Sequence, residues 1–339
     1  MNLDKLSTDA TERMADLVRR QHPSLDTMML SPAGEFQSRT VALDTLTGEL
    51  TDCLAEAFRN RPSDDFPMLY FGWGKCRVGS TPLTNLFGMA GMPSYYQPLK
   101  AMLRDAQVGH PPTPWPIASS VAQPRIFSKE TCGPYTLAES LFMPLRPLIE
   151  AGYPPDKLHF IMLDRDPASS LASWLDKLRD RASANTLIHN YIIAVMNTLR
   201  VESYAGRQGI PVTHYVYEAS KEAVSSVRVL FDRLGLSSHF ADDAVTDWRK
   251  TGQLHSETSR IIFPNEPELY KPAGLHGSDT AYRFRARETA SLSDAVLGLL
   301  ERCGVNDIYR ASVKACVRDL QIDATTSERL FGNCIGAAA

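Results

Sequence analysis

The sequence predicts an α/β protein in which helices flank a central parallel sheet. Short apolar segments typical of buried strands recur between residues 67 and 217, and helical patterns follow the last two of them. The first of these segments leads through a glycine-rich loop into a helix. Strands that alternate with helices favour parallel pairing, and ligands of such sheets bind at the carboxyl ends of the strands.

Four segments are predicted to form the strands because each is short, apolar and bounded by turn residues. They are residues 67–72, 125–128, 158–163 and 211–217. The helical patterns recur with a period near 3.6 residues. They cover residues 8–21, 43–59, 82–89, 184–199, 287–302 and 308–320.

The chain is predicted to form one main domain with appendages. Residues 1–60 hold two amphipathic patterns and are expected to form a helical N-terminal extension, and residues 61–339 are expected to form a single globular unit. Within that unit, residues 250–286 are rich in Pro, Gly, Ser, His and Arg and show little periodicity. We expect this stretch to be a long loop region that covers the site.

Composition excludes several classes of protein. A formal charge of −3 argues against a general nucleic-acid binder, which needs a basic excess. Charged residues interrupt the first 17 positions, so a secretory signal is not expected, and residues 184–199 are too short and polar to span a bilayer. The six cysteines show no zinc-binding spacing. We expect a cytoplasmic protein without a metal; the sequence predicts no oligomeric state.

The loop after the first strand has the composition of an anion site. Residues 72–82 read Gly-Trp-Gly-Lys-Cys-Arg-Val-Gly-Ser-Thr-Pro, which places glycines, hydroxyls and cations before a helix N-terminus. Gly74 and Gly79 have the spacing of the Walker A glycines, but Ser80 stands where the phosphate-binding lysine of that motif belongs. This departure disfavours a kinase or an ATPase.

The cations lie inside the loop instead, at Lys75 and Arg77. Residues 77–81, Arg-Val-Gly-Ser-Thr, resemble the 5′-phosphosulfate loop of the sulfotransferases that use 3′-phosphoadenosine 5′-phosphosulfate (PAPS). The resemblance implies a P-loop-like sulfotransferase fold for residues 61–339. It also implies that the 5′-phosphosulfate is bound by Lys75, Cys76, Arg77, Val78, Gly79, Ser80 and Thr81. We expect Cys76 to be a bystander, because no nearby histidine activates it.

A second segment resembles the 3′-phosphate motif of the same family. Arg165 follows the third strand and Ser173 lies eight residues further on, so a guanidinium and a hydroxyl can hold one phosphate. Residues 210–236 are similar to the late strand and helix of the family. Family members often add a basic C-terminal segment over the nucleotide, for which Arg249 and Lys250 or residues 282–285 are candidates.

The resemblance implies transfer of a sulfuryl group from PAPS to a hydroxyl or amine of a small molecule, a glycan or a biosynthetic intermediate. Arg77 is expected to neutralise the donor and Lys129 to assist the leaving group. The histidine and glutamate that serve as bases in many family members are replaced by Thr131 and Gln97. We therefore expect Glu130 to be the general base, ahead of His255 and His276.

Two alternatives stay open. The segment 160–164 also looks like a Walker B strand that ends in Asp164, which suggests a nucleotide-dependent kinase. We expect Asp164 instead to orient Arg165 or to cap the next helix. The other alternative is a sulfotransferase-like protein that binds nucleotide without turnover, for which Gln97 and Thr131 are the motivation. The acceptor pocket is expected to include Tyr95, Tyr96, Trp115 and Phe142.

Overall fold

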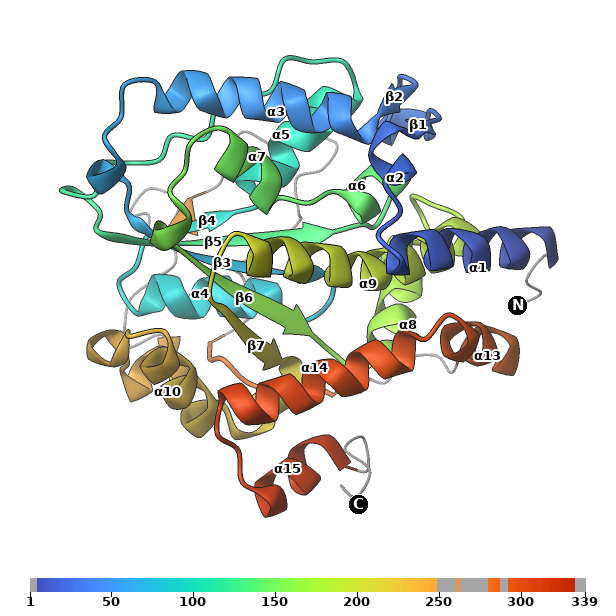
Figure 1. The fold of residues 1–339 in the computed structure, drawn as a ribbon. Coiled ribbons are helices and arrows are strands. Elements are labelled where there is room, and N and C mark those ends of the chain that lie inside the picture. Colours follow the sequence, from blue (N-terminus) through green and yellow to red (C-terminus); the bar gives the residue numbers. More distant parts are fainter. Residues whose placement is uncertain (1–4, 249–260, 263–279, 287–291, 333–339) are drawn as a thin grey trace.

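A parallel sheet forms the centre of the protein in the computed structural model, which describes residues 5–248, 261–262, 280–286 and 292–332 (Figure 1). The strand order is β7-β6-β3-β5-β4-β8, and each neighbouring pair is parallel. The predicted class, a central parallel sheet flanked by helices, is confirmed. The strands are β3 (Met68–Lys75), β4 (Ser94–Tyr96), β5 (Arg125–Cys132), β6 (Leu158–Asp164), β7 (Val212–Val216) and β8 (Ile261–Ile262).

Helices cover both faces of this sheet (Figure 1). One layer shares a hydrophobic core with the sheet and contains α1 (Lys5–Arg19), α3 (Leu43–Phe58), α5 (Pro98–Gln107), α6 (Leu137–Leu141), α7 (Leu145–Glu150), α8 (Pro167–Leu178), α9 (Ala184–Arg207) and α13 (Asp294–Arg302). The other layer contains α4 (Ser80–Met89), α10 (Ala223–Arg233), α11 (Asp242–Thr246), α14 (Val305–Asp319) and α15 (Ala324–Phe331). Between α2 (Ser24–Thr27) and α3, β1 (Met29–Leu30) and β2 (Val41–Ala42) form a separate antiparallel pair.

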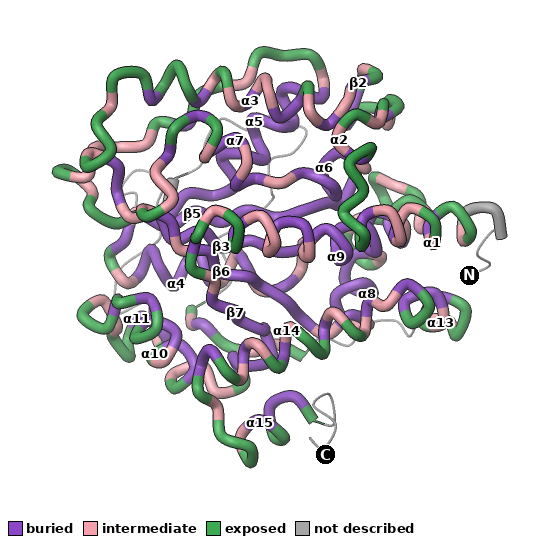
Figure 2. The backbone as a smooth tube through the Cα atoms, in the orientation of Figure 1, coloured by how far each residue is buried: buried purple, intermediate pink, exposed green. Residues whose placement is uncertain are grey.

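The central strand β3 shows how the sequence builds two cores. Leu69, Phe71 and Trp73 alternate along β3 and belong to the first core, whereas Tyr70 belongs to the second. Side chains two residues apart point to the same face of a strand, so a nearly continuous apolar run is buried on both sides. The strands β3 to β7 are accordingly buried along nearly their whole length (Figure 2).

All four predicted strands are present, and two of them extend three or more residues past their predicted ends. The strand β3 continues past Gly72 to Lys75, and β5 continues past Ser128 to Cys132. At Gly74, a Cβ atom would overlap the carbonyl oxygen of Leu163 in β6. Glycine thus permits a close approach of β3 and β6 instead of ending the strand. The short strands β4 and β8 and the helix α5 between β4 and β5 were not predicted.

The predicted helices mostly match the structure. The patterns over residues 8–21, 43–59, 82–89, 184–199 and 308–320 correspond to α1, α3, α4, α9 and α14, and α9 is buried along much of its length. The helix predicted over residues 287–302 is seen as α13, which begins at Asp294 after the extended N-cap Ser293; residues 287–291 lie outside the described part of the chain. Most of the predicted long loop region, residues 250–286, also lies outside it.

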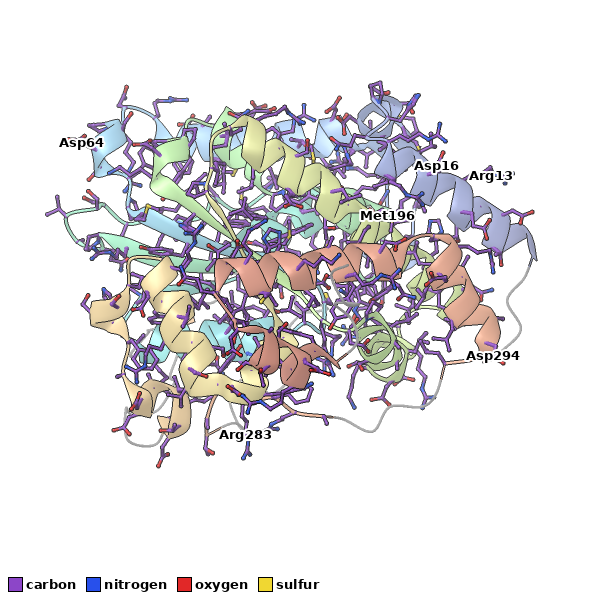
Figure 3. The ribbon with its side chains drawn as sticks, turned by 60° about the horizontal axis from the view of Figure 1, so that its bottom comes forward. Arg13, Asp16, Asp64, Met196, Arg283 and Asp294 are labelled. Carbon is purple, nitrogen blue, oxygen red and sulfur yellow. The ribbon has the colours of Figure 1, made fainter. Side chains whose placement is uncertain are left out.

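The N-terminal helices pack directly on the main domain. The helix α1 contacts α9, and α3 contacts α5 and α7. Charged side chains such as Asp64 and Asp294 lie at the periphery, whereas Met196 of α9 is fully buried (Figure 3). Among the described residues, no helix combines the length and the apolar character that crossing a membrane requires.

A buried ion pair between His214 and Asp319 joins the edge strand β7 to α14, and the partly exposed Glu202 of α9 also contacts His214. Nδ1 of His214 lies 3.0 Å from Oδ2 of Asp319, and Nε2 lies 3.2 Å from Oε1 of Glu202. Burial alone would lower the pKa of His214, but these carboxylates outweigh it and raise the pKa to about 9. Burial would raise the pKa of Asp319, but hydrogen bonds from His214 outweigh it and lower the pKa to about 2. The imidazolium and the carboxylate stabilise one another.

We expect His214→Gln to lower the free energy of unfolding by about 2 kcal/mol at about pH 6, because Asp319 loses its buried cation. Because the pKa of His214 is higher in the folded protein, protonated His214 adds to the free energy of unfolding. This contribution is fully present below about pH 6.5 and is lost as the pH rises through about 9. Urea unfolding of both proteins at several pH values measures this difference. A difference that does not shrink between about pH 6 and pH 9.5 would contradict the ion pair.

Candidate functional site

The loop between β3 and α4 is tightly curled. Arg77 and Gly79 both adopt left-handed backbone conformations, with φ of 70° and 77°. A Cβ atom at Gly79 would overlap the ring of Tyr217, so this position requires glycine. Gly79 is also the N-cap of α4 and provides no side-chain acceptor. The N–H groups in the first turn of α4 can therefore serve an anion.

The two predicted phosphate motifs lie side by side. Nε of Arg77 donates a hydrogen bond to Oγ of Ser173 at 3.0 Å, across 96 residues of sequence. Nη1 of Arg165 donates to the carbonyl oxygen of Arg77 at 3.1 Å. Nε1 of Trp174 donates to the carbonyl oxygen of Cys76 at 2.7 Å, so α8 is attached to the same loop. The parallel order of β3 and β6 brings about this meeting, because both motifs follow the carboxyl ends of these strands.

Arg165 is buried among groups that do not satisfy all of its donors. Its guanidinium lies 5.0 Å from the ring centroid of Tyr217. Among the described residues, Nε of Arg165 and Oε2 of Glu218 are buried without a hydrogen-bond partner. Buried donors of this kind are rare in folded proteins and often mark the place of a ligand.

Residues 282–285, from the C-terminal part of the chain, lie beside Tyr217. The hydroxyl of Tyr217 accepts a hydrogen bond from the backbone N–H of Arg285 at 3.0 Å, and the ring of Tyr217 lies 5.1 Å from that of Phe284. Residues 282–285 thus contact Tyr217, whose ring also lies 5.0 Å from the guanidinium of Arg165. Arg249 and Lys250, the other candidates, lie outside the described residues, as do His255 and His276.

A pocket of about 280 Å³ opens beside the loop. The described part of its wall contains no carboxylate and no imidazole, and six of its side chains are cations. These are Arg77, Lys100, Arg104, Lys129, Lys177 and Arg181. Ser80 and Thr81 bring the first turn of α4 to the same wall. Positive side chains and a helix N-terminus together favour a strongly anionic ligand.

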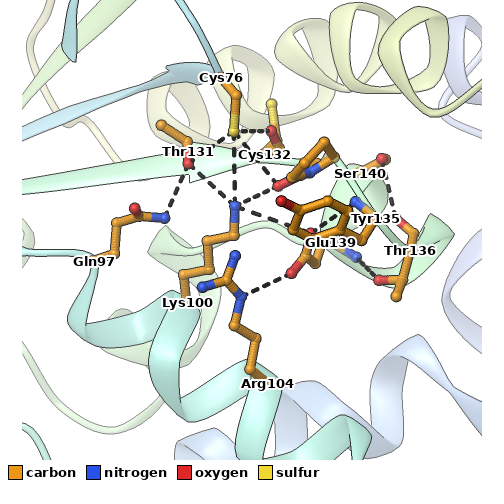
Figure 4. Close-up of polar contacts among 12 residues, drawn as sticks. Cys76, Gln97, Lys100, Arg104, Thr131, Cys132, Tyr135, Thr136, Glu139 and Ser140 are labelled. Atoms are coloured by element: carbon orange, nitrogen blue, oxygen red, sulfur yellow. Dashed lines mark hydrogen bonds and ion pairs between the residues drawn. The ribbon is translucent and has the colours of Figure 1, made fainter. Parts of the chain in front are cut away.

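Lys100 of α5 lies at the centre of a polar network on one side of the pocket (Figure 4). Its Nζ donates to Oγ1 of Thr131 at 3.2 Å and to the carbonyl oxygen of Gly133, and it lies 3.8 Å from Sγ of Cys76. Glu139 lies 4.0 Å from Lys100 and accepts from Nε of Arg104 at 2.9 Å. One fully buried carboxylate therefore holds two buried cations.

Lys129 lines the pocket from the end of β5. Its Nζ donates to Oε1 of Gln97 at 2.9 Å and lies 3.9 Å from the ring centroid of Tyr96. Nε2 of Gln97 donates to Oγ1 of Thr131 at 3.0 Å. The side chains of Gln97 and Thr131, both neutral, thus bond to one another beside Lys129.

The position of Glu130 leads us to revise its predicted role as the general base. Alternation along β5 puts Lys129 and Thr131 in the pocket wall and leaves Glu130 out of it. Its carboxylate accepts hydrogen bonds from the backbone N–H groups of Leu99, at 2.8 Å, and Lys100, at 3.1 Å, in the first turn of α5. Burial raises its pKa to about 8, against the effect of these bonds. The carboxylate of Glu130 therefore caps the N-terminus of α5 and does not face the pocket.

Lys75 also differs from its predicted role as a phosphate ligand. It is buried at the end of β3, forms an ion pair with Asp164 and donates to the carbonyl oxygen of Arg165 at 3.2 Å. Burial alone would lower the pKa of Lys75, but Asp164 outweighs it and raises the pKa. Asp164 also accepts the backbone N–H of Arg165 at 2.7 Å and so orients that residue as predicted, while Asp166 caps α8.

The remaining predicted residues divide between the pocket and the cores. Cys76 and Tyr96 line the pocket, and Val78 is part of the second core. Tyr95, Trp115 and Phe142 belong to the first core. The sequence interpretation missed four cations of the pocket, Lys100, Arg104, Lys177 and Arg181. Within each of the pairs Lys100/Arg104 and Lys177/Arg181, the two cations are four residues apart, which is about one helical turn. This spacing was the signal in the sequence that could have identified them.

Comparison of the chain with protein-family models, with curated proteins and with solved structures finds no match in any of the three. In the part of the chain that the structure describes, no group of three or more His, Cys, Asp or Glu side chains is arranged to hold a metal ion.

We expect Glu130→Ala to lower the free energy of unfolding by about 1–2 kcal/mol, because two N–H groups at the start of α5 lose their acceptor. Glu56→Ala is the control: Glu56 is exposed and pairs with exposed Arg59, so it should change the free energy by less than about 0.5 kcal/mol. Chemical denaturation measures both. Unchanged stability of Glu130→Ala would remove the capping role and restore Glu130 as a candidate base.

Proposed function

We propose that this protein is an enzyme that transfers a sulfuryl group from PAPS to a hydroxyl or amine of a small molecule, a glycan or a biosynthetic intermediate. The observation that carries the proposal is the cluster of Arg77, Ser173 and Arg165, in which the two phosphate motifs contact one another. The donor has phosphate groups at two ends of one nucleoside, so it needs two such motifs in one site. We propose the P-loop-like sulfotransferase fold on the same ground.

The residues present fit the two ends of the donor. The first turn of α4, with Ser80 and Thr81, and the guanidinium of Arg77 offer donors to the 5′-phosphosulfate. Arg165 has a buried Nε that lacks an acceptor, and Ser173 adds a hydroxyl, which together suit the 3′-phosphate. Lys75 supports this site through Asp164 instead of contacting the donor.

The reaction requires little covalent chemistry from the protein. The acceptor oxygen or nitrogen forms a bond to sulfur, the bond from sulfur to the 5′-phosphate oxygen breaks, and adenosine 3′,5′-bisphosphate leaves. The proton of the acceptor is released. Negative charge develops on the leaving phosphate, where Arg77 and Lys129 are suited to stabilise it. A sulfuryl group carries less negative charge than a terminal phosphate, so the proposal includes no metal.

One observation favours the alternative that the protein binds the nucleotide without turnover. The described pocket wall contains neither a carboxylate nor an imidazole, as expected of a protein that binds the nucleotide without turnover. The kinase alternative is weaker, since Asp164 pairs with Lys75 and bonds to the backbone of Arg165. Turnover of PAPS with acceptor mixtures separates an enzyme from a binding protein.

We expect calorimetry without added metal to show that adenosine 3′,5′-bisphosphate binds at least about tenfold more tightly than ADP, because ADP lacks the 3′-phosphate. Arg165→Ala should remove most of this preference. Arg179→Ala is the matched control, since Arg179 is an exposed arginine at the end of α8 and does not line the pocket.

Thermal melting of each variant establishes that it is folded before binding is compared. Equal affinity for the two nucleotides in the wild-type protein would overturn the proposal. Binding of ATP that depends on magnesium would favour the kinase alternative.

A further inference from the structure

Glu218 brings a buried carboxylate to the segment that carries Arg165. Arg165 directly follows β6, and Glu218 lies two residues past the end of the neighbouring parallel strand β7, so both are at the same edge of the sheet. Oε1 of Glu218 accepts a hydrogen bond from the backbone N–H of Asp166 at 3.2 Å. Glu218 is 6% exposed and Arg165 is 7% exposed. One oxygen of this carboxylate therefore holds the backbone next to Arg165.

The other oxygen of Glu218 is an open acceptor. In the part of the chain that the structure describes, Oε2 of Glu218 and Nε of Arg165 are both buried, and each lacks a hydrogen-bond partner, so they do not bond to one another. Buried polar atoms in folded proteins are nearly always paired, and those that are not often mark the place of a ligand. A ligand that satisfies both atoms carries a hydrogen-bond donor close to an anionic acceptor.

The charges around Glu218 indicate what kind of donor fits. Burial raises the pKa of Glu218, although backbone N–H groups, including that of Asp166, and the Arg165 guanidinium counteract part of this effect. A hydrogen bond donated to the carboxylate compensates for its burial. An anionic group placed against Oε2 would be repelled. A neutral hydroxyl therefore suits Oε2 of Glu218, while the anionic group of the same ligand suits Arg165.

The proposed donor carries these two groups on neighbouring carbon atoms. Its 3′-phosphate is the anion that the proposed function assigns to Arg165 and Ser173, and its ribose 2′-hydroxyl is on the adjacent carbon. Carboxylates bind ribose hydroxyls in the same way in dinucleotide-binding folds. The amino group of the purine is also a donor, but it lies at the far end of the nucleoside from the 3′-phosphate. The 2′-hydroxyl is thus the donor closest to the group that Arg165 would hold.

We propose that Oε2 of Glu218 accepts a hydrogen bond from the ribose 2′-hydroxyl of the nucleotide while Nε of Arg165 binds the 3′-phosphate. This inference rests on the proposed function and adds a residue that determines specificity at the donor site. Glu218 selects a ribonucleotide over a 2′-deoxyribonucleotide. It also selects the position of the phosphate, because the phosphate and the free hydroxyl bind side chains of opposite charge.

The test compares adenosine 3′,5′-bisphosphate with 2′-deoxyadenosine 3′,5′-bisphosphate by calorimetry. The ratio of their dissociation constants measures the contribution of the 2′-hydroxyl. We expect the wild-type protein to bind the ribonucleotide at least about tenfold more tightly, because a hydrogen bond to a charged acceptor is stronger than one between neutral groups. Loss of the hydroxyl also changes the sugar itself, so the variants below decide whether the difference depends on Glu218.

Glu218→Gln retains an oxygen for the N–H of Asp166 and replaces Oε2 by an amide NH₂ group. It should reduce the ratio to about threefold or less, and Glu218→Ala should reduce it to within about twofold of unity. Glu222→Gln is the matched control. Glu222 is the last residue of the same short 3₁₀ helix, Tyr217–Glu222, but pairs with Arg329, so the ratio should stay as in the wild-type protein.

Thermal melting establishes that each variant is folded, and Glu218→Gln decides the question if Glu218→Ala does not fold. A wild-type ratio near one would overturn the inference. So would an equal loss of affinity for both nucleotides in Glu218→Gln, since Glu218 would then act only by holding the backbone beside Arg165. Either result leaves the proposed function in place. Failure of the wild-type protein to bind either nucleotide would overturn the proposed function and the inference with it.

Discussion

The buried ion pair between Lys75 and Asp164 is the interaction on which the candidate site depends. It joins the last residue of β3 to the last residue of β6, where the two strands are neighbours in the sheet. The glycine-rich loop begins directly after Lys75, and Arg165 directly follows Asp164. A buried pair adds little net stability compared with apolar packing, but loss of one partner leaves an uncompensated charge. The pair therefore acts mainly by keeping the two predicted phosphate motifs next to one another.

A second buried carboxylate holds cations of the pocket in place. Glu139 accepts a hydrogen bond from Arg104 and lies 4.0 Å from Lys100, and charged side chains are seldom fully buried unless they are paired. Its carboxylate compensates for part of the cost of burying these two cations beside the pocket.

The parts of the fold that depend on local pattern were predictable from the sequence. Residues 158–163 and 211–217 are strands because their apolar runs are short and bounded by turn residues, and α9 follows from its periodicity. The meeting of Arg77 with Ser173 follows from a general rule, that motifs after neighbouring parallel strands share one edge of the sheet. The fold class and the proximity of the two motifs were therefore within reach of sequence reasoning.

The roles of Lys75 and Glu130 were not predictable, because each depends on which face of a strand its side chain occupies near the strand's end. Extension of β3 by three residues turned Lys75 from a loop cation into a buried partner of Asp164. A short unpredicted strand, β4, and the helix α5 bring the N–H groups of Leu99 and Lys100 to Glu130. Adjacent residues of a strand point to opposite faces, so Lys129 lines the pocket and Glu130 does not. A one-residue error in the predicted register would exchange these two positions.

For the proposed reaction, the position of Glu130 outside the pocket wall bears on how the acceptor would lose its proton. A general base acts on a hydroxyl by accepting its proton, whereas nearby cations act by stabilising the ionised oxygen that remains. The described wall of the pocket is suited to the second route, because it offers Lys100 and Lys129 but no carboxylate or imidazole. In the proposed reaction, such a site favours acceptors whose hydroxyl is already acidic, because such a hydroxyl needs less help from a base to lose its proton.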